Sequence, residues 1–248
     1  MSREREAGAA GRHQFPTTSL RMVWAAAGQG PRSREALETL CGAYWYPLYA
    51  FFRRQVHDAE EARDLTQAFF TQVMERDTLR RFERERGRFR SFLLTCARHF
   101  LINERHRAAA AKRGGGVAPL SLDGPLEGAE ARYGVEPGRE ATPERIFEKE
   151  WAREVLARAM ERLRLDCERR GRTAHFEGLR AHLVGDGDAA TYRELGEGLG
   201  MTEGAVRVAV HRLRERFHQC LRDEIAQTVG HEDEVGAEVR YLVSVLRD

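Results

Sequence analysis

The chain has 248 residues and a net charge of +2, with 42% hydrophobic and 32% charged residues. This length supports one or two domains with hydrophobic cores, and the composition fits a helical protein. No stretch is apolar enough to span a membrane, and the first residues lack the apolar core of a signal peptide. We therefore expect a cytoplasmic protein that has no membrane partner.

Cysteine spacing and the absence of chemical motifs argue against an enzyme. The cysteines lie far apart and form no C-x-x-C pair: Cys41, Cys96, Cys167 and Cys220. This spacing does not suit a zinc site, and no nucleophile–base motif or phosphate-binding loop is found. We expect no catalytic residue, no metal and no cofactor.

Basic residues are concentrated in the first half of the chain. Residues 1–113 carry 21 Lys and Arg against 13 Asp and Glu, whereas residues 144–248 carry 18 against 21. Excess positive charge is expected on a surface that binds phosphates, but a solvated surface or one that faces anionic lipid looks the same. Charge alone therefore does not identify the partner.

Residues 19–113 are predicted to form the first of two helical domains. Residues 1–18 are polar, show no periodicity and are expected to be disordered. A short helix at 19–27 is predicted to precede a longer helix that begins near Ser33. Pro47 is expected to kink or split that longer helix.

Two further helices are predicted in this domain. Asp58 and Glu61 form a D-x-x-E capping box at the start of one, and the other occupies 91–107 with an apolar and a basic side. Basic residues that alternate with aromatic ones suit single-stranded DNA, because bases stack on rings and phosphates pair with cations. Phe89 fits either a stacking surface or the core.

Residues 114–141 are rich in Gly, Ala and Pro and are predicted to form a flexible linker. Thr142 is a suitable N-cap and Pro143 suits the first helical position, so a long helix is expected to begin there. A shorter helix is predicted near 174–184. The second helical domain is expected to cover 142–228.

Within this second domain, the segment from Thr191 is predicted to form two helices joined by a tight turn. Thr191 and Glu194 form a T-x-x-E capping box for the first helix. Gly198 and Gly200 are expected to break that helix, and Thr202 is expected to be the N-cap of the second.

The second of these helices has an apolar seam and a basic face. The seam repeats at helical spacing: Val206, Val210, Leu213, Phe217 and Leu221. The basic face lies beside it: Arg207, His211, Arg212, Arg214, Arg216 and His218. This is the plan of a helix-turn-helix, whose second helix enters the major groove of DNA. An ordinary helical hairpin with a solvated Arg-rich face is the alternative.

The predicted fold class is all-α, with two helical domains and an acidic C-terminal tail at 229–248. The tail is expected to carry one more amphipathic helix. Its apolar side would hold Val235, Val239, Leu242, Val243 and Leu246.

Four segments resemble bacterial sigma factors of the extracytoplasmic-function type. D-A-E-E-A-R-D-L-T-Q-A-F-F at 58–70 and F-R-S-F-L-L-T-C-A-R-H-F-L-I-N-E-R at 89–105 are similar to region 2 of that family. T-Y-R-E-L-G-E-G-L-G-M-T-E-G-A-V-R at 191–207 and H-R-L-R at 211–214 are similar to region 4. Departures from the family pattern suggest a divergent subgroup: Phe92, His99, Asn103 and Ala209.

The resemblance implies three binding roles and no catalysis. Core RNA polymerase would be bound through the clamp of its large subunit by Asp64, Gln67 and Phe70. The unpaired minus-ten strand of promoter DNA would be bound by Phe89, Arg90, Arg98, Asn103, Arg105 and Arg107. The minus-thirty-five element would be bound by Thr202, Glu203, Gly204, Arg207, His211, Arg212 and Arg214. An anti-sigma factor is a possible further partner.

Two other functions remain open at this point. A stand-alone helix-turn-helix regulator would need only residues 191–220, and the 58–107 block would then have no purpose. A helical signalling adaptor would bind protein partners through its helix faces, with the acidic tail helix as the docking element.

Overall fold

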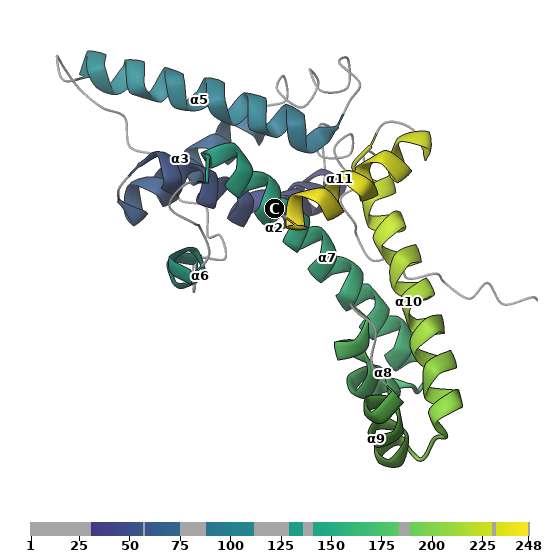
Figure 1. Ribbon diagram of the computed structural model, residues 1–248. Helices are drawn as coiled ribbons and strands as arrows, with labels where there is room; N and C mark the ends of the chain where they lie inside the picture. Colours follow the sequence, from purple (N-terminus) through teal and green to yellow (C-terminus); the bar gives the residue numbers. More distant parts are fainter. Residues whose placement is uncertain are drawn as a thin grey trace, which may run out of the picture.

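The computed structural model describes residues 31–56, 58–74, 88–111, 129–135, 141–183, 189–229 and 232–247. All regular structure in these ranges is helical, which confirms the predicted all-α class (Figure 1). The α-helices are α2 (Pro31–Gln55), α3 (Ala59–Met74), α5 (Phe89–Ala111), α6 (Ala129–Val135), α7 (Pro143–Arg169), α8 (Thr173–Leu179), α9 (Ala189–Leu199), α10 (Glu203–Ala226) and α11 (Val235–Arg247). Two 3-10 turns accompany them, η1 (Arg180–His182) and η2 (Glu232–Glu234).

Aromatic packing holds α2, α3 and α5 together. Phe52 of α2, Phe69 of α3 and Phe100 of α5 meet edge to face, with ring centroids 5.6–5.8 Å apart. Such pairs add to the stabilisation from burial alone. Pro47 lies inside α2, which continues as one helix and is not split. Asp58 caps α3 as predicted, because its carboxylate accepts the N–H groups of the first helical turn.

The long helix α7 connects the two ends of the molecule (Figure 1). Thr142 is its N-cap, with the hydroxyl accepting the Arg145 N–H, and Pro143 is its first residue. Its buried apolar stripe confirms the predicted one: Phe147, Trp151, Val155, Ala159 and Leu163. The helix packs on α2 and also on α8, α10 and α11, so one element contributes to the core of both predicted domains.

Part of the predicted linker is helical. Residues 129–135 form α6, where Glu130 accepts bonds from the Tyr49 hydroxyl and the Arg53 guanidinium of α2. The bond from Arg53 holds the pKa of the Glu130 carboxyl below its usual value. Arg132 pairs with Glu150 of α7 at 2.7 Å. Residues 129–135, predicted as part of a flexible linker, are thus helical here and contact both α2 and α7.

The C-terminal helices α8 to α10 begin and end close to their predicted positions. The buried seam of α10 is the predicted one. The first helix of the pair differs, because α9 begins at Ala189, so Thr191 lies inside the helix and is not its cap. Gly198 also lies inside α9, and only Gly200, with φ +65°, ends it.

The tail helix α11 presents a different face from the predicted one. Val235 and Leu242 are buried as expected, but Val243 is 39% exposed and Val245 is buried instead. The buried side also includes the carboxylate of Glu238. The prediction used apolar residues alone to define the buried face of α11. It missed the observed face because Glu238, a charged residue, lies in the middle of it.

Several expected features lie outside the described residues. These are the disordered segment 1–18, the short helix at 19–27, and linker residues 114–128 and 136–140. In the part of the chain that the structure describes, no helix has the length and apolar character needed to cross a membrane.

Because α7 belongs to both cores, Trp151→Ala is expected to weaken the whole molecule. Deleting a buried aromatic side chain lowers the free energy of unfolding by about 3–5 kcal/mol. Chemical denaturation followed by circular dichroism would measure the loss, with the exposed Ala157→Ser as the control. A two-step transition in which only the first step shifts would contradict a shared core.

Candidate nucleic-acid interface

The turn between α9 and α10 is fixed by close backbone contacts. The Met201 N–H donates to the Gly196 carbonyl at 2.8 Å. A Cβ on Gly196 would lie 2.5 Å from the Met201 carbonyl oxygen, so no larger side chain fits there without a shift. Thr202 then caps α10, since its hydroxyl accepts the Ala205 N–H at 3.3 Å. These contacts hold the angle between the two helices.

The N-terminal half of α10 presents polar side chains to solvent. Arg207 is 55% exposed and pairs with Glu203 one turn earlier at 2.8 Å. His211 is 74% exposed and lies 3.5 Å from Glu215. Thr202 and Gly204 are exposed as well. The structure therefore places these predicted DNA contacts on one open surface.

Arg214 differs from this group. Its guanidinium donates two bonds to the His182 carbonyl oxygen, at 3.1 and 2.9 Å, and its side chain is half-buried. Those bonds satisfy a carbonyl at the end of η1 and attach α10 to the preceding turn. In this conformation Arg214 supports the helix pair and does not face solvent with the other basic residues.

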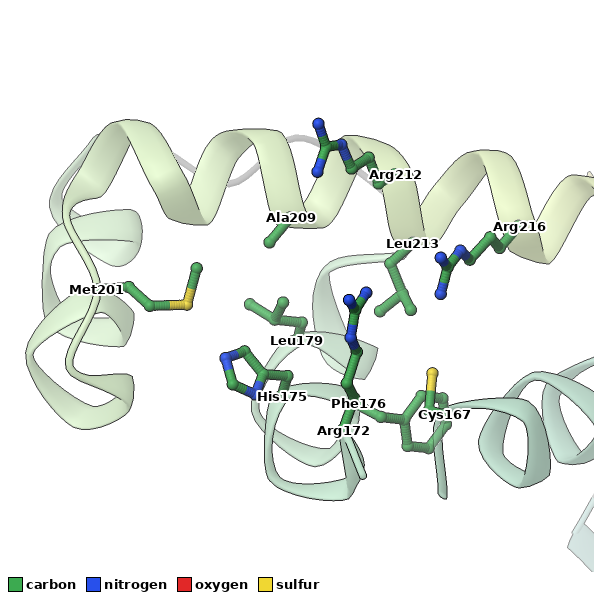
Figure 2. A pocket seen from close by; sticks show the side chains of 10 residues that line it. All are labelled: Cys167, Arg172, His175, Phe176, Leu179, Met201, Ala209, Arg212, Leu213 and Arg216. Atoms are coloured by element: carbon green, nitrogen blue, oxygen red, sulfur yellow. The ribbon is translucent and has the colours of Figure 1, made fainter. Parts of the chain in front are cut away.

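A cavity of about 560 Å³ lies between α8 and α10 beside this surface (Figure 2). Its apolar walls include Phe176 and Leu213, and its rim carries Arg172, Arg212 and Arg216. Among the described residues, none of these three guanidiniums is paired with a carboxylate. Like charges gathered without counter-charges favour an anionic ligand such as a phosphate. Arg172 was not among the predicted contacts.

The basic side of α5 forms a second exposed surface. Arg105 donates to the side chain of Gln55 at 3.2 Å, Arg98 pairs with Glu144 at 3.0 Å, and Arg107 pairs with Glu104. Asn103 is exposed on the same helix.

A hollow of about 330 Å³ lies beside Asn103 between α3 and α5. Its lining includes Phe69, His99 and Phe100. Phe69 and Phe100 are core residues at its base, and Gln72, His99 and Asn103 supply its polar groups.

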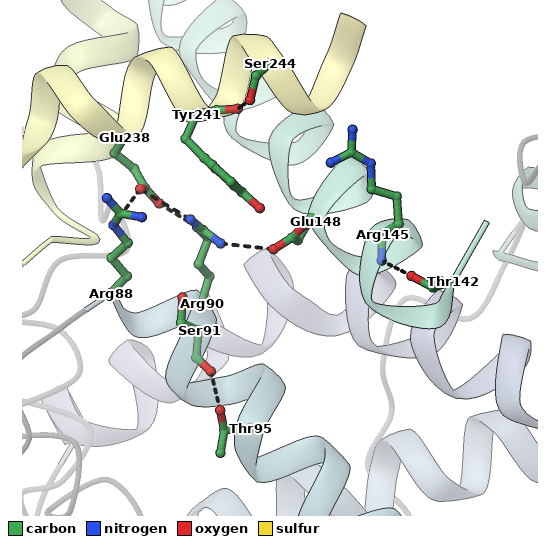
Figure 3. Close-up of polar contacts among 10 residues, drawn as sticks. All are labelled: Arg88, Arg90, Ser91, Thr95, Thr142, Arg145, Glu148, Glu238, Tyr241 and Ser244. Carbon is green, nitrogen blue, oxygen red and sulfur yellow. Dashed lines mark hydrogen bonds and ion pairs between the residues drawn. The ribbon is translucent and has the colours of Figure 1, made fainter. Parts of the chain in front are cut away.

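Phe89 and Arg90 do not belong to that exposed surface. Phe89 packs edge to face on Tyr44 with centroids 5.4 Å apart, so the core alternative holds for it in this conformation. Arg90 is 4% exposed and donates to Glu238 of α11 at 2.5 Å (Figure 3). The expectation that both contact a single strand is not met here, because α11 and the core cover them.

The buried charge of Arg90 is compensated from several sides. Its guanidinium lies 4.0 Å from the Tyr241 ring centre and 4.9 Å from that of Trp151. Glu148 of α7 is its second carboxylate, at 3.5 Å. Burial alone would lower the pKa of Arg90, but the bonds to Glu238 raise that pKa above its usual value. The side chain therefore stays charged inside the protein.

The three predicted polymerase contacts separate into two groups on α3. Asp64 is exposed and Gln67 is half-buried. Phe70 is 4% exposed and packs on Phe69, with centroids 6.0 Å apart. Phe70 is therefore a core residue here.

Comparison with known families identifies the N-terminal helices. Residues 43–111 match the family model of sigma-70 region 2. These residues are therefore similar to sigma-70 region 2. No curated protein and no solved structure matches the chain.

The region 2 match spans the second half of α2, all of α3 and all of α5. It supports a sigma-70 family factor, a non-enzymatic protein of transcription initiation, and it implies binding to core RNA polymerase and promoter DNA. The resemblance found at 58–70 and 89–105 is confirmed at this level. The predicted region 4 lies outside the matched residues.

The two glycines near the end of α9 allow a matched test of the turn. Gly196→Ala is expected to lower the free energy of unfolding by about 1–3 kcal/mol, because the added methyl group overlaps the Met201 carbonyl. Gly198→Ala has open space and should be neutral or stabilising. Thermal melting and duplex-DNA binding of both variants would measure the difference. Equal melting temperatures would show that the turn is not constrained at Gly196.

Proposed function

We propose that this protein is a sigma factor of the extracytoplasmic-function type, which directs core RNA polymerase to a specific set of promoters. The observation that carries the proposal is a region 2 match in the same chain as an exposed, basic helix pair. A region 2 by itself would account only for promoter melting and polymerase binding. A second DNA-binding body adds recognition of an upstream element.

Recognition of the minus-thirty-five element is assigned to α10. Arg207 near its start has the length to form a bidentate pair with a guanine edge. Glu203 and His211 lie on the same exposed surface and complete the base-edge contacts. Arg212, with Arg172 and Arg216 at the cavity rim, would bind phosphates, which add affinity without sequence information.

Capture of the unpaired minus-ten strand is assigned to the exposed side of α5. Arg98, Arg105 and Arg107 would bind its phosphates, and Asn103 lies beside the hollow that would receive a base. The family resemblance places promoter melting in this region.

Polymerase binding is assigned to α3, through Asp64 and Gln67 against the clamp of the large subunit. An anti-sigma factor and a cytoplasmic location stay predictions from the resemblance and the sequence.

The experiment that tests the proposal combines binding and transcription. The purified full-length chain is expected to co-elute with core RNA polymerase and to support run-off transcription from promoters selected out of genomic fragments. Tight binding to duplex DNA without polymerase association would instead favour a stand-alone regulator. Polymerase association that never yields promoter-dependent transcripts would favour an adaptor.

Arg207→Ala is expected to lower transcription from a selected promoter by about 10–100-fold, because one bidentate base contact is worth about 1–3 kcal/mol. Run-off transcription and binding of the upstream element would measure the loss. The control is Arg222→Ala, an exposed arginine far from the start of the same helix. An equal effect of both variants would show that Arg207 contributes charge only.

Arg212→Ala gives the contrasting result that a phosphate contact predicts. Binding should weaken to a similar extent on all sequences, and the slope of log affinity against log salt should fall by about one. Unchanged salt dependence would remove Arg212 from the phosphate-binding surface.

A further inference from the structure

Val208 lies on the side of α10 that faces away from the protein core. At about 100° per residue, it stands about 170° from the centre of the buried seam formed by Val206, Val210, Leu213 and Phe217. It is 50% exposed, which is unusual for a large hydrophobic residue in the part of the chain that the structure describes. An apolar residue therefore occupies the position where an amphipathic helix normally carries a polar one.

Neither helix stability nor burial accounts for a valine at this position. A β-branched side chain loses rotamer freedom in a helix, so valine is a weaker helix former than Lys, Arg, Gln or Glu. Burial within the chain contributes little, because half of Val208 is open to solvent. The side chain is therefore better explained by a partner outside the chain.

The neighbours of Val208 on the outer face of α10 are small toward the helix start and basic at the sides. Gly204 and Ala205 are exposed one turn earlier, and a Cβ on Gly204 would meet nothing within 4 Å. Arg207 and Arg212 are exposed on opposite sides of Val208. Short side chains let the helix approach the floor of a DNA groove, while flanking cations meet the phosphates. This charge distribution favours DNA over an apolar protein partner.

We propose that Val208 recognises a thymine in the upstream promoter element by packing against its C5-methyl group. The inference rests on the proposed function, in which α10 enters the major groove. There the four base pairs present hydrogen-bond donors and acceptors, and the thymine methyl group is their apolar feature. Any other base at this position would bring a donor or acceptor against Val208 and deprive it of water, which is unfavourable.

Replacement of thymine by deoxyuridine tests this contact, because it removes the methyl group and leaves the base pairing unchanged. Each thymine of an upstream element selected with the reconstituted holoenzyme is replaced in turn, on both strands, and binding is measured by competition. In wild type, one replacement is expected to weaken binding about fourfold, as expected for losing the burial of one methyl group. Val208→Ala should bind the unmodified element about fourfold more weakly and should be insensitive to that replacement.

The matched control is Val243→Ala, the same change at an exposed valine of α11, which should keep the full sensitivity to deoxyuridine. Both variants should fold, since each position is exposed and alanine is the better helix former. Wild type and Val208→Ala are compared on the same DNA, so any effect of the methyl group on the DNA itself cancels.

The outcomes separate this inference from the proposed function. Wild type that is insensitive to every replacement, or a selected element without thymine on either strand, overturns the inference and leaves the sigma-factor function standing. Equal sensitivity in wild type and Val208→Ala also overturns it, because another residue then contacts the methyl group.

A further outcome would assign Val208 to a protein surface. If Val208→Ala binds the element normally but binds core RNA polymerase more weakly, the inference is overturned. Absence of promoter-specific binding by the wild-type holoenzyme overturns the proposed function together with the inference.

Discussion

The buried pairing of Arg90 with Glu238 is the interaction on which the arrangement of the molecule depends. The Arg90 guanidinium is enclosed by two aromatic rings and two carboxylates. Separating it from them would leave buried charges without partners, which is strongly unfavourable. Because its members come from α5, α7 and α11, the pairing links segments that are 148 residues apart in the chain. The N-terminal helices and the C-terminal helices are consequently one body in this structure.

The arginines of this protein differ in whether a carboxylate neutralises them. Those at helix contacts are neutralised by carboxylates, as Arg53 is by Glu130 and Arg132 is by Glu150. Around the cavity beside α10, by contrast, Arg172, Arg212 and Arg216 have no carboxylate partner among the described residues. The difference in pairing, and not the number of arginines, distinguishes a surface suited to phosphate from structural charge.

Helical periodicity and capping residues predicted much of the fold. The stripe on α7, the seam on α10 and the caps Asp58, Thr142 and Thr202 are local features, so a sequence pattern contains them. The buried side of α11 could not be predicted in this way, because Glu238 is buried only when Arg90 is brought to it by the tertiary fold. The helix α6, which lies in a Gly-rich stretch, was also not predicted. Its ion pairs are with Arg53 and Glu150, which are distant in sequence, so a local pattern does not contain them.

Among the candidate contacts, exposure separated residues that sequence alone grouped together. Phe89, Arg90 and Phe70 have the residue types expected of a binding surface, but their burial depends on which helix faces them. Arg207 and His211 are exposed on the outer face of α10, where Arg207 contacts Glu203 and the Tyr192 ring and His211 lies near Glu215. Conversely, Arg172 precedes the helix pair and could be assigned to the site only once α8 was placed beside α10.

The sharing of α7 has a consequence for how the protein is made. While the ribosome has produced only the first hundred or so residues, the surface of α2 that receives Phe147 and Trp151 has no cover. The nascent N-terminal helices would then expose apolar surface until α7 emerges, which is the situation in which chaperones bind growing chains. Fragments that end before α7 would carry the same uncovered surface and would be prone to aggregate.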